Sequence, residues 1–166
     1  MGVAGCGKSS LGMALAQQLG LTLVEGDNHH SQESLTKMRS GVPLTDADRD
    51  GWLEALSNEL RSRAAGQVMT CSALKRAYRD RLRRASPGLR FVYLDISREQ
   101  ALARVTERSA SHFFSTSLVD SQFTTLESPV GEPGVLRVDA LDALSQLQIQ
   151  VCTWLNTYQP TINEQA

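Results

Sequence analysis

Short apolar runs alternate with longer amphipathic stretches along most of the chain. The apolar runs predict four strands, near residues 22–25, 67–71, 90–95 and 135–138, and a stretch with helical spacing follows each of them. Strands and helices that alternate in this way are typical of βα units around a parallel sheet. The pattern therefore predicts a single α/β domain in which a parallel sheet lies between two layers of helices.

Residues that favour helix ends mark several of the expected helices. Apolar residues recur at helical spacing from Leu11 to Leu19, and Gly20 is placed to end that helix. Thr45 and Asp48 have the spacing of a capping box at the start of another helix, although Asp replaces the usual Glu or Gln. Further helices are expected over residues 34–39, 73–85, 98–108, 117–127 and 141–157.

Length and charge restrict the class of protein. At 166 residues the chain has the length of one domain, and we expect that domain over residues 1–158, followed by a disordered tail over 159–166. Seventeen Lys and Arg against 18 Asp and Glu give a net charge of -1, so no overall field favours nucleic acid or an anionic membrane. No apolar run approaches the roughly 18 residues of a membrane span. The simplest expectation is a soluble cytoplasmic protein, whose three cysteines are free thiols.

A glycine-rich loop opens the chain. Gly2, Gly5, Gly7, Lys8 and Ser9 match the pattern G-x-x-x-x-G-K-[ST] at every fixed position. In such a loop, backbone N–H groups converge on phosphate oxygens at the positive end of the following helix. The lysine bridges the terminal phosphates, and the serine hydroxyl is a ligand for Mg²⁺. The residues expected to contact a nucleotide are Gly2, Val3, Ala4, Gly5, Cys6, Gly7, Lys8, Ser9 and Ser10. A glycine-rich turn without a ligand is the simpler alternative.

Two carboxylates follow the first predicted strand. Glu25 and Asp27 are two residues apart at a strand end, which places them on the same side. Strand ends of a parallel sheet meet at the edge where the loop also lies. Phosphoryl transfer to an alcohol needs a carboxylate that accepts the hydroxyl proton. One of the two is therefore expected near the Mg²⁺ shell and the other near the acceptor hydroxyl, whereas solvated turn carboxylates are the alternative.

Three segments resemble the gluconate kinases. The stretch "EGDNHHSQESLTKMRSGVPLTDADRDGWL" is similar to a family pattern that runs roughly GD-x-x-H-P-x-x-N-x-x-KM-x-x-G-x-PL-x-D-x-DR-x-x-WL. "CSALKRAYRDRLR" and "HFFSTSLVDSQFTTLESP" resemble the second and third blocks of the same family. The resemblance covers nearly the whole chain in order. It implies a P-loop kinase fold and transfer of the γ-phosphate of ATP, with Mg²⁺, to the 6-hydroxyl of D-gluconate. It also suggests a homodimer.

The resemblance further implies roles for individual residues. Lys8 would be the phosphate cation, and Ser9 with Glu25 the metal ligands. Asp27 would be the catalytic base or the group that orients the acceptor hydroxyl. Arg108, with Arg104, would belong to a lid over about residues 104–116. The substrate-binding residues would be Asp27, His30, Lys37, Arg49, Ser72, Lys75, Arg76, Arg79 and Gln122. For the basic run after Leu74, a solvated helix face is the simpler explanation.

Only one residue precedes the loop, although in the resembling kinases a central buried strand leads into it. We therefore expect Met1 to be an internal methionine of a longer protein. Two other functions are kept as alternatives. The first is a kinase for another small hydroxy acid such as shikimate, and the second is a nucleotide-binding module without turnover.

Overall fold

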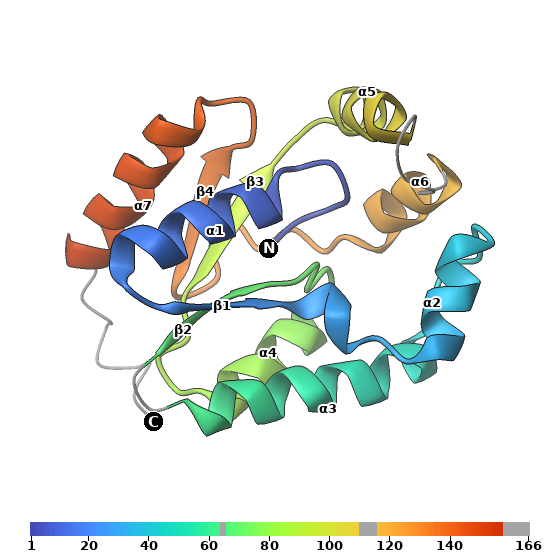
Figure 1. The fold of residues 1–166 in the computed structure, drawn as a ribbon, viewed down its shortest axis with the longest axis horizontal. Coiled ribbons are helices and arrows are strands. Elements are labelled where there is room, and N and C mark those ends of the chain that lie inside the picture. The colour runs from blue at the N-terminus through green and yellow to red at the C-terminus, as the bar shows by residue number, and fades with distance from the viewer. Residues whose placement is uncertain (64–65, 110–115, 158–166) are drawn as a thin grey trace.

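The computed structural model describes residues 1–63, 66–109 and 116–157, apart from the side chains of 108, 109 and 116. The elements follow one another as α1 (Lys8–Leu19), β1 (Thr22–Glu25), the 3₁₀ helix η1 (Gly26–His29), α2 (Gln32–Arg39), α3 (Asp46–Ser62), β2 (Gln67–Thr70), α4 (Arg76–Ala85), β3 (Phe91–Asp95), α5 (Arg98–Ser109), α6 (Thr116–Thr125), β4 (Val135–Asp139) and α7 (Leu144–Thr157). Helices lie on both sides of the strands: α1 and α7 are on one side, and α3 and α4 are on the other (Figure 1).

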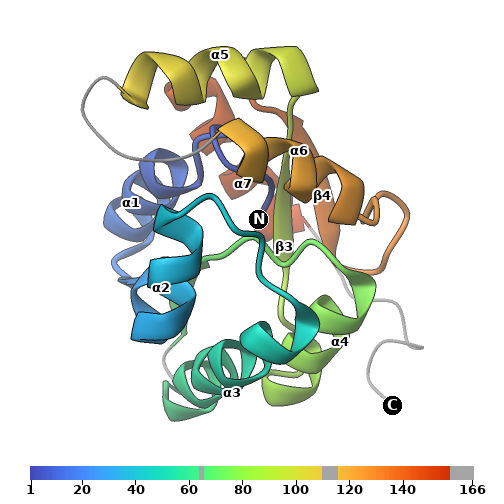
Figure 2. The same cartoon turned by 90° about the vertical axis from the view of Figure 1, so that its right-hand side faces the viewer.

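The four strands lie where the apolar runs predicted them, and the α/β class is confirmed. β1 pairs in parallel with β2, and β3 pairs in parallel with β4. β2 and β3 are not paired with each other in the described part of the chain, so the expected single sheet is two parallel pairs. The N-terminus lies between the two strand pairs (Figure 1) and near the centre of the molecule (Figure 2).

The helix boundaries differ from the predictions where local hydrogen bonds compete with the helix. α7 begins at Leu144 and not at Leu141, because the Asp139 side chain accepts a hydrogen bond from the backbone of Leu141 and holds a turn. The expected capping box is confirmed: the Thr45 hydroxyl accepts from the Asp48 N–H at 3.2 Å, and the Asp48 carboxylate accepts from the Thr45 N–H at 2.9 Å.

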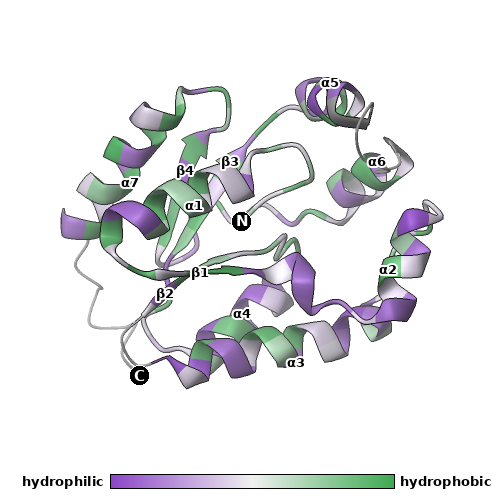
Figure 3. Cartoon of the chain, in the orientation of Figure 1, coloured by the Kyte–Doolittle hydropathy of each residue, from purple (hydrophilic) through white to green (hydrophobic). Residues whose placement is uncertain are grey.

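Two clusters of buried residues stabilise the fold, one on each side of the strands. The first joins α1 and α7 to β3 and β4, with Leu11, Leu94 and Val151 in it. The second joins α3 and α4 to β3, with Trp52 and Leu56 in it. Hydrophobic residues occur in all four strands, as strands covered on both faces require (Figure 3). No helix among the described residues is long and apolar enough to cross a membrane.

Candidate active site

The phosphate-binding loop is held tightly against the strands and α5. Gly2 has φ +144°, and a Cβ there would lie 2.9 Å from the Leu94 carbonyl oxygen. Gly5 has φ +80°, and a Cβ there would lie 2.8 Å from the Ala101 carbonyl oxygen. Only glycine fits both positions, because the backbone is in a region that other residues avoid and there is no room for a side chain. The loop leads directly into the N-terminus of α1, where the helix dipole favours anions.

Lys8 lies across this loop. Its Nζ atom donates a hydrogen bond of 2.9 Å to the Val3 carbonyl oxygen. The side chain therefore stays beside the backbone N–H groups that face a phosphate in loops of this sequence.

A cavity of about 680 Å³ brings the loop and the predicted acceptor residues together. Lys8 and Ser9 line it from α1, and Asp27 lines it from η1. The predicted residues that line it are Ala4, Gly5, Gly7, Lys8, Ser9, Ser10, Asp27, His30, Arg49, Ser72 and Gln122. Gly2, Val3 and Cys6, the other predicted nucleotide contacts in the loop, are buried and do not line the cavity.

The backbone next to Asp27 is fixed by α3. The indole Nε1 of Trp52 donates a hydrogen bond of 2.8 Å to the Gly26 carbonyl oxygen. A Cβ at Gly26 would lie 2.4 Å from the Thr70 carbonyl oxygen, so η1 also packs closely on β2. Asp27 itself is exposed at the cavity wall. Its position is therefore set by contacts of the preceding residue, while its carboxylate stays open to a ligand.

Glu25 lies at the carboxyl end of β1 and faces the loop. Its Oε2 atom accepts hydrogen bonds from the Ser9 hydroxyl at 3.1 Å and from the Thr70 hydroxyl. A carboxylate and a hydroxyl are the ligands that Mg²⁺ prefers, and Mg²⁺ keeps several waters in sites of this kind. The predicted pair Ser9 and Glu25 therefore fits a magnesium ion. Thr70, which the sequence did not single out, orients the carboxylate.

His30, which also lines the cavity, stacks on Trp52. The ring centroids are 4.8 Å apart, and the planes differ by 8°. Its Nδ1 atom is buried and has no hydrogen-bond partner among the described residues. Burial lowers the pKa of His30 below its ordinary value; the charge of Asp27 opposes this shift, and Arg49 adds to it. A neutral imidazole is thus available to a hydroxyl group.

Of the predicted substrate cations, Arg49 alone lines the cavity. Its Nη1 atom donates to the Leu44 carbonyl oxygen, which fixes the guanidinium at the wall. Arg39, at the end of α2, also lines the cavity and was missed, because a basic residue in the last turn of a helix is usually solvated. The helical spacing could have identified Arg39, because Leu35, Met38 and Arg39 share one face of α2 and all three line the cavity.

Three other predicted cations are engaged elsewhere. Lys37 pairs with Asp48 and, together with Thr45, lowers the pKa of that carboxyl to about 2. Lys75 pairs with Asp46, and Arg76 lies 3.8 Å from Asp80 on the exposed face of α4. None of the three lines the cavity.

The structure contradicts the prediction that Arg79 grips a substrate. Its side chain has 0 % exposure and forms a bidentate pair with Glu132. It also donates to the carbonyl oxygens of Ala73, Leu74 and Glu127. Every donor direction of the guanidinium points to the protein, so Arg79 has a structural role.

Arg104 and Arg108 are the two arginines predicted for the lid. Arg104 does not line the cavity; it donates to the carbonyl oxygens of Gly5 at 3.4 Å and of Ala140 at 3.0 Å, which braces the loop from behind. Arg108 is in the last turn of α5, and its side chain lies outside the described residues. Residues 110–115 of the expected lid and the expected tail over 159–166 lie outside them as well.

Comparisons with known proteins identify the family of this chain. The shikimate kinase family model matches residues 4–124. The gluconokinase of Gluconobacter oxydans is 43% identical over 141 residues, which are 83% of this chain and 79% of that protein. The chain belongs to the gluconokinase family. The thermosensitive gluconokinase of Escherichia coli is 40% identical over 143 residues, 84% of this chain and 76% of that protein.

Solved structures give the same result for the fold. A gluconokinase from Sinorhizobium meliloti superposes with a TM-score of 0.81 at 40% identity, and the match covers 95% of each chain. A sugar kinase from Janibacter has a TM-score of 0.88 at 38% identity over 94% of this chain and 91% of that one. A shikimate kinase from Aquifex aeolicus, at 14% identity, shares the fold alone. The P-loop kinase fold and the kinase class are thereby established for this member of the gluconokinase family.

Proposed function

We propose that this protein transfers the γ-phosphate of ATP to the 6-hydroxyl of D-gluconate. The observation that carries the proposal is that Lys8 and Asp27 line one cavity of about 680 Å³. A donor nucleotide at the loop and a small acceptor at Asp27 then share a single space. Membership in the gluconokinase family selects the sugar acid as the acceptor.

The reaction requires one proton to leave the substrate. The Asp27 carboxylate accepts the proton of the 6-hydroxyl as the new oxygen–phosphorus bond forms and the bond to the ADP oxygen breaks. Lys8 and the backbone N–H groups of the loop stabilise the negative charge on the transferred group. Ser9 and Glu25 would hold Mg²⁺, which supplies further positive charge when it is bound.

The carboxylate end of the substrate needs cations far from Asp27. Arg49 and Arg39 are the described arginines that line the cavity, and Arg39 has no hydrogen bond or ion pair in the described part of the chain. An arginine can hold a carboxylate by two parallel hydrogen bonds. We therefore assign the carboxylate to this pair, and the substrate hydroxyls to His30, Ser72 and Gln122. The homodimer expected from the resemblance stays a prediction.

A coupled assay that measures ADP formation tests this function. We expect turnover with ATP and D-gluconate, and no comparable turnover with shikimate. A preference for shikimate would replace the substrate, and binding of ATP without product from any sugar acid would favour the non-catalytic alternative.

A further inference from the structure

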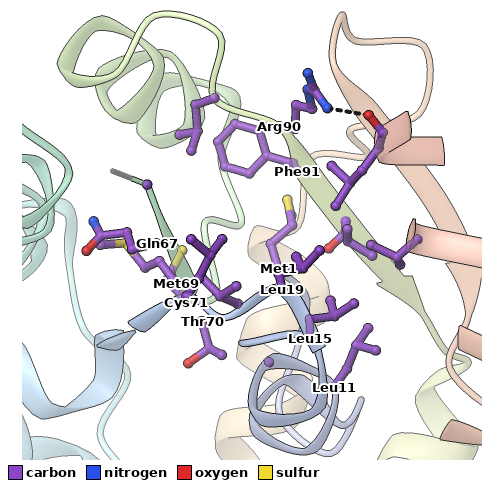
Figure 4. A pocket seen from close by; sticks show the side chains of 18 of the residues that line it. Met1, Leu11, Leu15, Leu19, Gln67, Met69, Thr70, Cys71, Arg90 and Phe91 are labelled. Atoms are coloured by element: carbon purple, nitrogen blue, oxygen red, sulfur yellow. Dashed lines mark hydrogen bonds between the residues drawn. The ribbon is translucent and has the colours of Figure 1, made fainter. Parts of the chain in front are cut away.

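A second cavity, of about 380 Å³, lies between the two strand pairs (Figure 4). Apolar side chains such as Leu11, Leu15 and Phe91 make up most of its lining. Arg90 also lines it, and its Nη1 atom donates to the Leu155 carbonyl oxygen at 2.9 Å. A sugar acid with several hydroxyls would find few partners there. The cations that bind the acid are therefore sought in the cavity at the phosphate-binding loop.

Arg49, which lines the cavity at the loop, lies over the ring of Tyr78. Its guanidinium carbon is 5.9 Å from the ring centroid. At this distance a cation is attracted to an aromatic face. Arg49 belongs to the first turn of α3, and Tyr78 belongs to the first turn of α4. The contact therefore supports the cavity wall from the neighbouring helix.

The ring of Tyr78 is itself fixed in place. It is 6 % exposed and belongs to the same buried cluster as Trp52. Its hydroxyl donates to the Asp46 carboxylate, which also pairs with Lys75 at 2.7 Å. Burial and then the hydrogen bond to Asp46 raise the pKa of Tyr78 to about 12, so the hydroxyl stays protonated and remains a donor. The ring is thus a rigid support for Arg49.

The Arg49 guanidinium is held on one edge as well as on its face. Its Nη1 atom donates to the Leu44 carbonyl oxygen at 2.5 Å. A guanidinium has five N–H donors, so others stay available to a ligand. A side chain that is oriented before binding loses less conformational entropy when the ligand binds. Contacts that orient Arg49 should therefore raise the affinity for a carboxylate.

We propose that Tyr78 is a positioning residue for the sugar acid, because its ring holds the Arg49 guanidinium in the orientation that binds the substrate carboxylate. Tyr78 does not line the cavity, so it acts through Arg49. This role rests on the proposed function. The carboxylate is at the opposite end of the substrate from the reacting 6-hydroxyl, so loss of the support should weaken binding without slowing the chemical step.

The test is a set of substitutions at Tyr78, assayed with gluconate and with D-glucitol, which lacks the carboxylate. In Tyr78→Leu the ring is lost, so KM for gluconate should rise about 10-fold, while kcat stays within about 2-fold of the wild type. KM for D-glucitol should not change. Tyr78→Phe keeps the ring and should keep KM for gluconate within about 2-fold. If Tyr78→Leu does not fold, Tyr78→Met, which is closer in volume, carries the same prediction.

Phe91→Leu is the matched control. Phe91 belongs to the same buried cluster as Tyr78, and the Arg83 guanidinium carbon lies 5.0 Å from its ring centroid. Neither Phe91 nor Arg83 lines the cavity at the loop. Phe91→Leu should therefore lower the Tm, as Tyr78→Leu does, and leave KM for gluconate unchanged.

Several outcomes would overturn the role of Tyr78. They are an unchanged KM for gluconate in Tyr78→Leu, an equal rise for gluconate and D-glucitol, and a rise in Phe91→Leu or Tyr78→Phe as large as that in Tyr78→Leu. Each of these presupposes turnover of gluconate by the wild type. Absence of that turnover would refute the proposed function, and the role of Tyr78 with it, so the two failures are distinguishable.

Discussion

The side-chain oxygen of Gln122 accepts a hydrogen bond of 2.6 Å from the backbone N–H of Ala4. This bond joins α6 to the phosphate-binding loop across 118 positions of the chain. Since both residues line the cavity, the contact fixes the loop relative to the acceptor side.

Replacement of Gln122 should therefore lower the rate without unfolding the protein. Gln122→Met keeps the length of the side chain but removes the acceptor, a loss of about 1 kcal/mol. We expect kcat/KM for gluconate to fall about 5-fold in the coupled assay. Gln17→Met, on the exposed part of α1, is the control and should behave as the wild type. A Gln122→Met rate within experimental error of the wild type would remove this role.

Arg79 should be required for stability and not for specificity. Arg79→Leu leaves the carboxylate of Glu132, whose side chain is 8 % exposed, partnered by Arg83 alone. Breaking a buried pair from one side costs about 3–5 kcal/mol in the free energy of unfolding. Urea denaturation should show this loss in Arg79→Leu, and less than about 0.5 kcal/mol in Arg76→Leu on the same helix.

The double variant Arg79→Leu/Glu132→Leu tests whether the loss of stability comes from the unpaired Glu132 carboxylate. The variant removes the carboxylate that has lost its Arg79 partner, so it should recover part of the stability that Arg79→Leu loses. If Arg79→Leu instead folds as stably as the wild type and has a raised KM for gluconate, the structural role is wrong.

His30 should make stability depend on pH. Its pKa is lowered in the folded state, from 6.5, chiefly by burial. The unfolded chain then binds a proton more readily than the folded chain, so the free energy of unfolding falls as the pH drops from about 7 through the folded pKa. His30→Gln should lose less stability than the wild type between pH 7.5 and pH 5 in denaturation curves. Identical slopes for both proteins would show that His30 does not titrate in this way.

Arg39 should distinguish an acid from a neutral polyol. Arg39→Gln removes one cation from the cavity wall, so KM for gluconate should rise about 10-fold or more, the cost of a charged hydrogen bond. Turnover of D-glucitol, which has the hydroxyls without the carboxylate, should be unaffected. Arg84→Gln, an exposed arginine on α4 outside the cavity lining, is the control. Equal effects of Arg39→Gln on both substrates would place the carboxylate elsewhere.

The strands, the loop and the capping box could be predicted because local patterns determine them. Short apolar runs located β1 to β4, and the glycine spacing located a loop whose residues lie together in sequence. Thr45 and Asp48 are also only three residues apart. In each case the physical cause acts within a few positions.

The cations of the site could not be assigned from sequence, because their partners are distant. Arg79 is buried by Glu132, 53 positions away, and Lys75 is held by Asp46, 29 positions away. The basic composition of the run after Leu74 is equally compatible with a solvated helix face and with a group of substrate-binding residues. Only the tertiary contacts distinguish these alternatives, and they show that Arg79 forms a buried ion pair with Glu132.

The most direct measurement of the central claim compares kcat for gluconate with ATP affinity in Asp27→Asn. Because the amide cannot accept the hydroxyl proton, kcat should fall by about 10³-fold, while the Kd for ATP, measured by calorimetry, should change less than about 2-fold. Asp50→Asn, on an exposed position of α3, should leave both values unchanged. A kcat within 10-fold of the wild type, or a loss of ATP binding as large as the loss of rate, would contradict a cavity in which Lys8 serves the phosphate and Asp27 serves the acceptor.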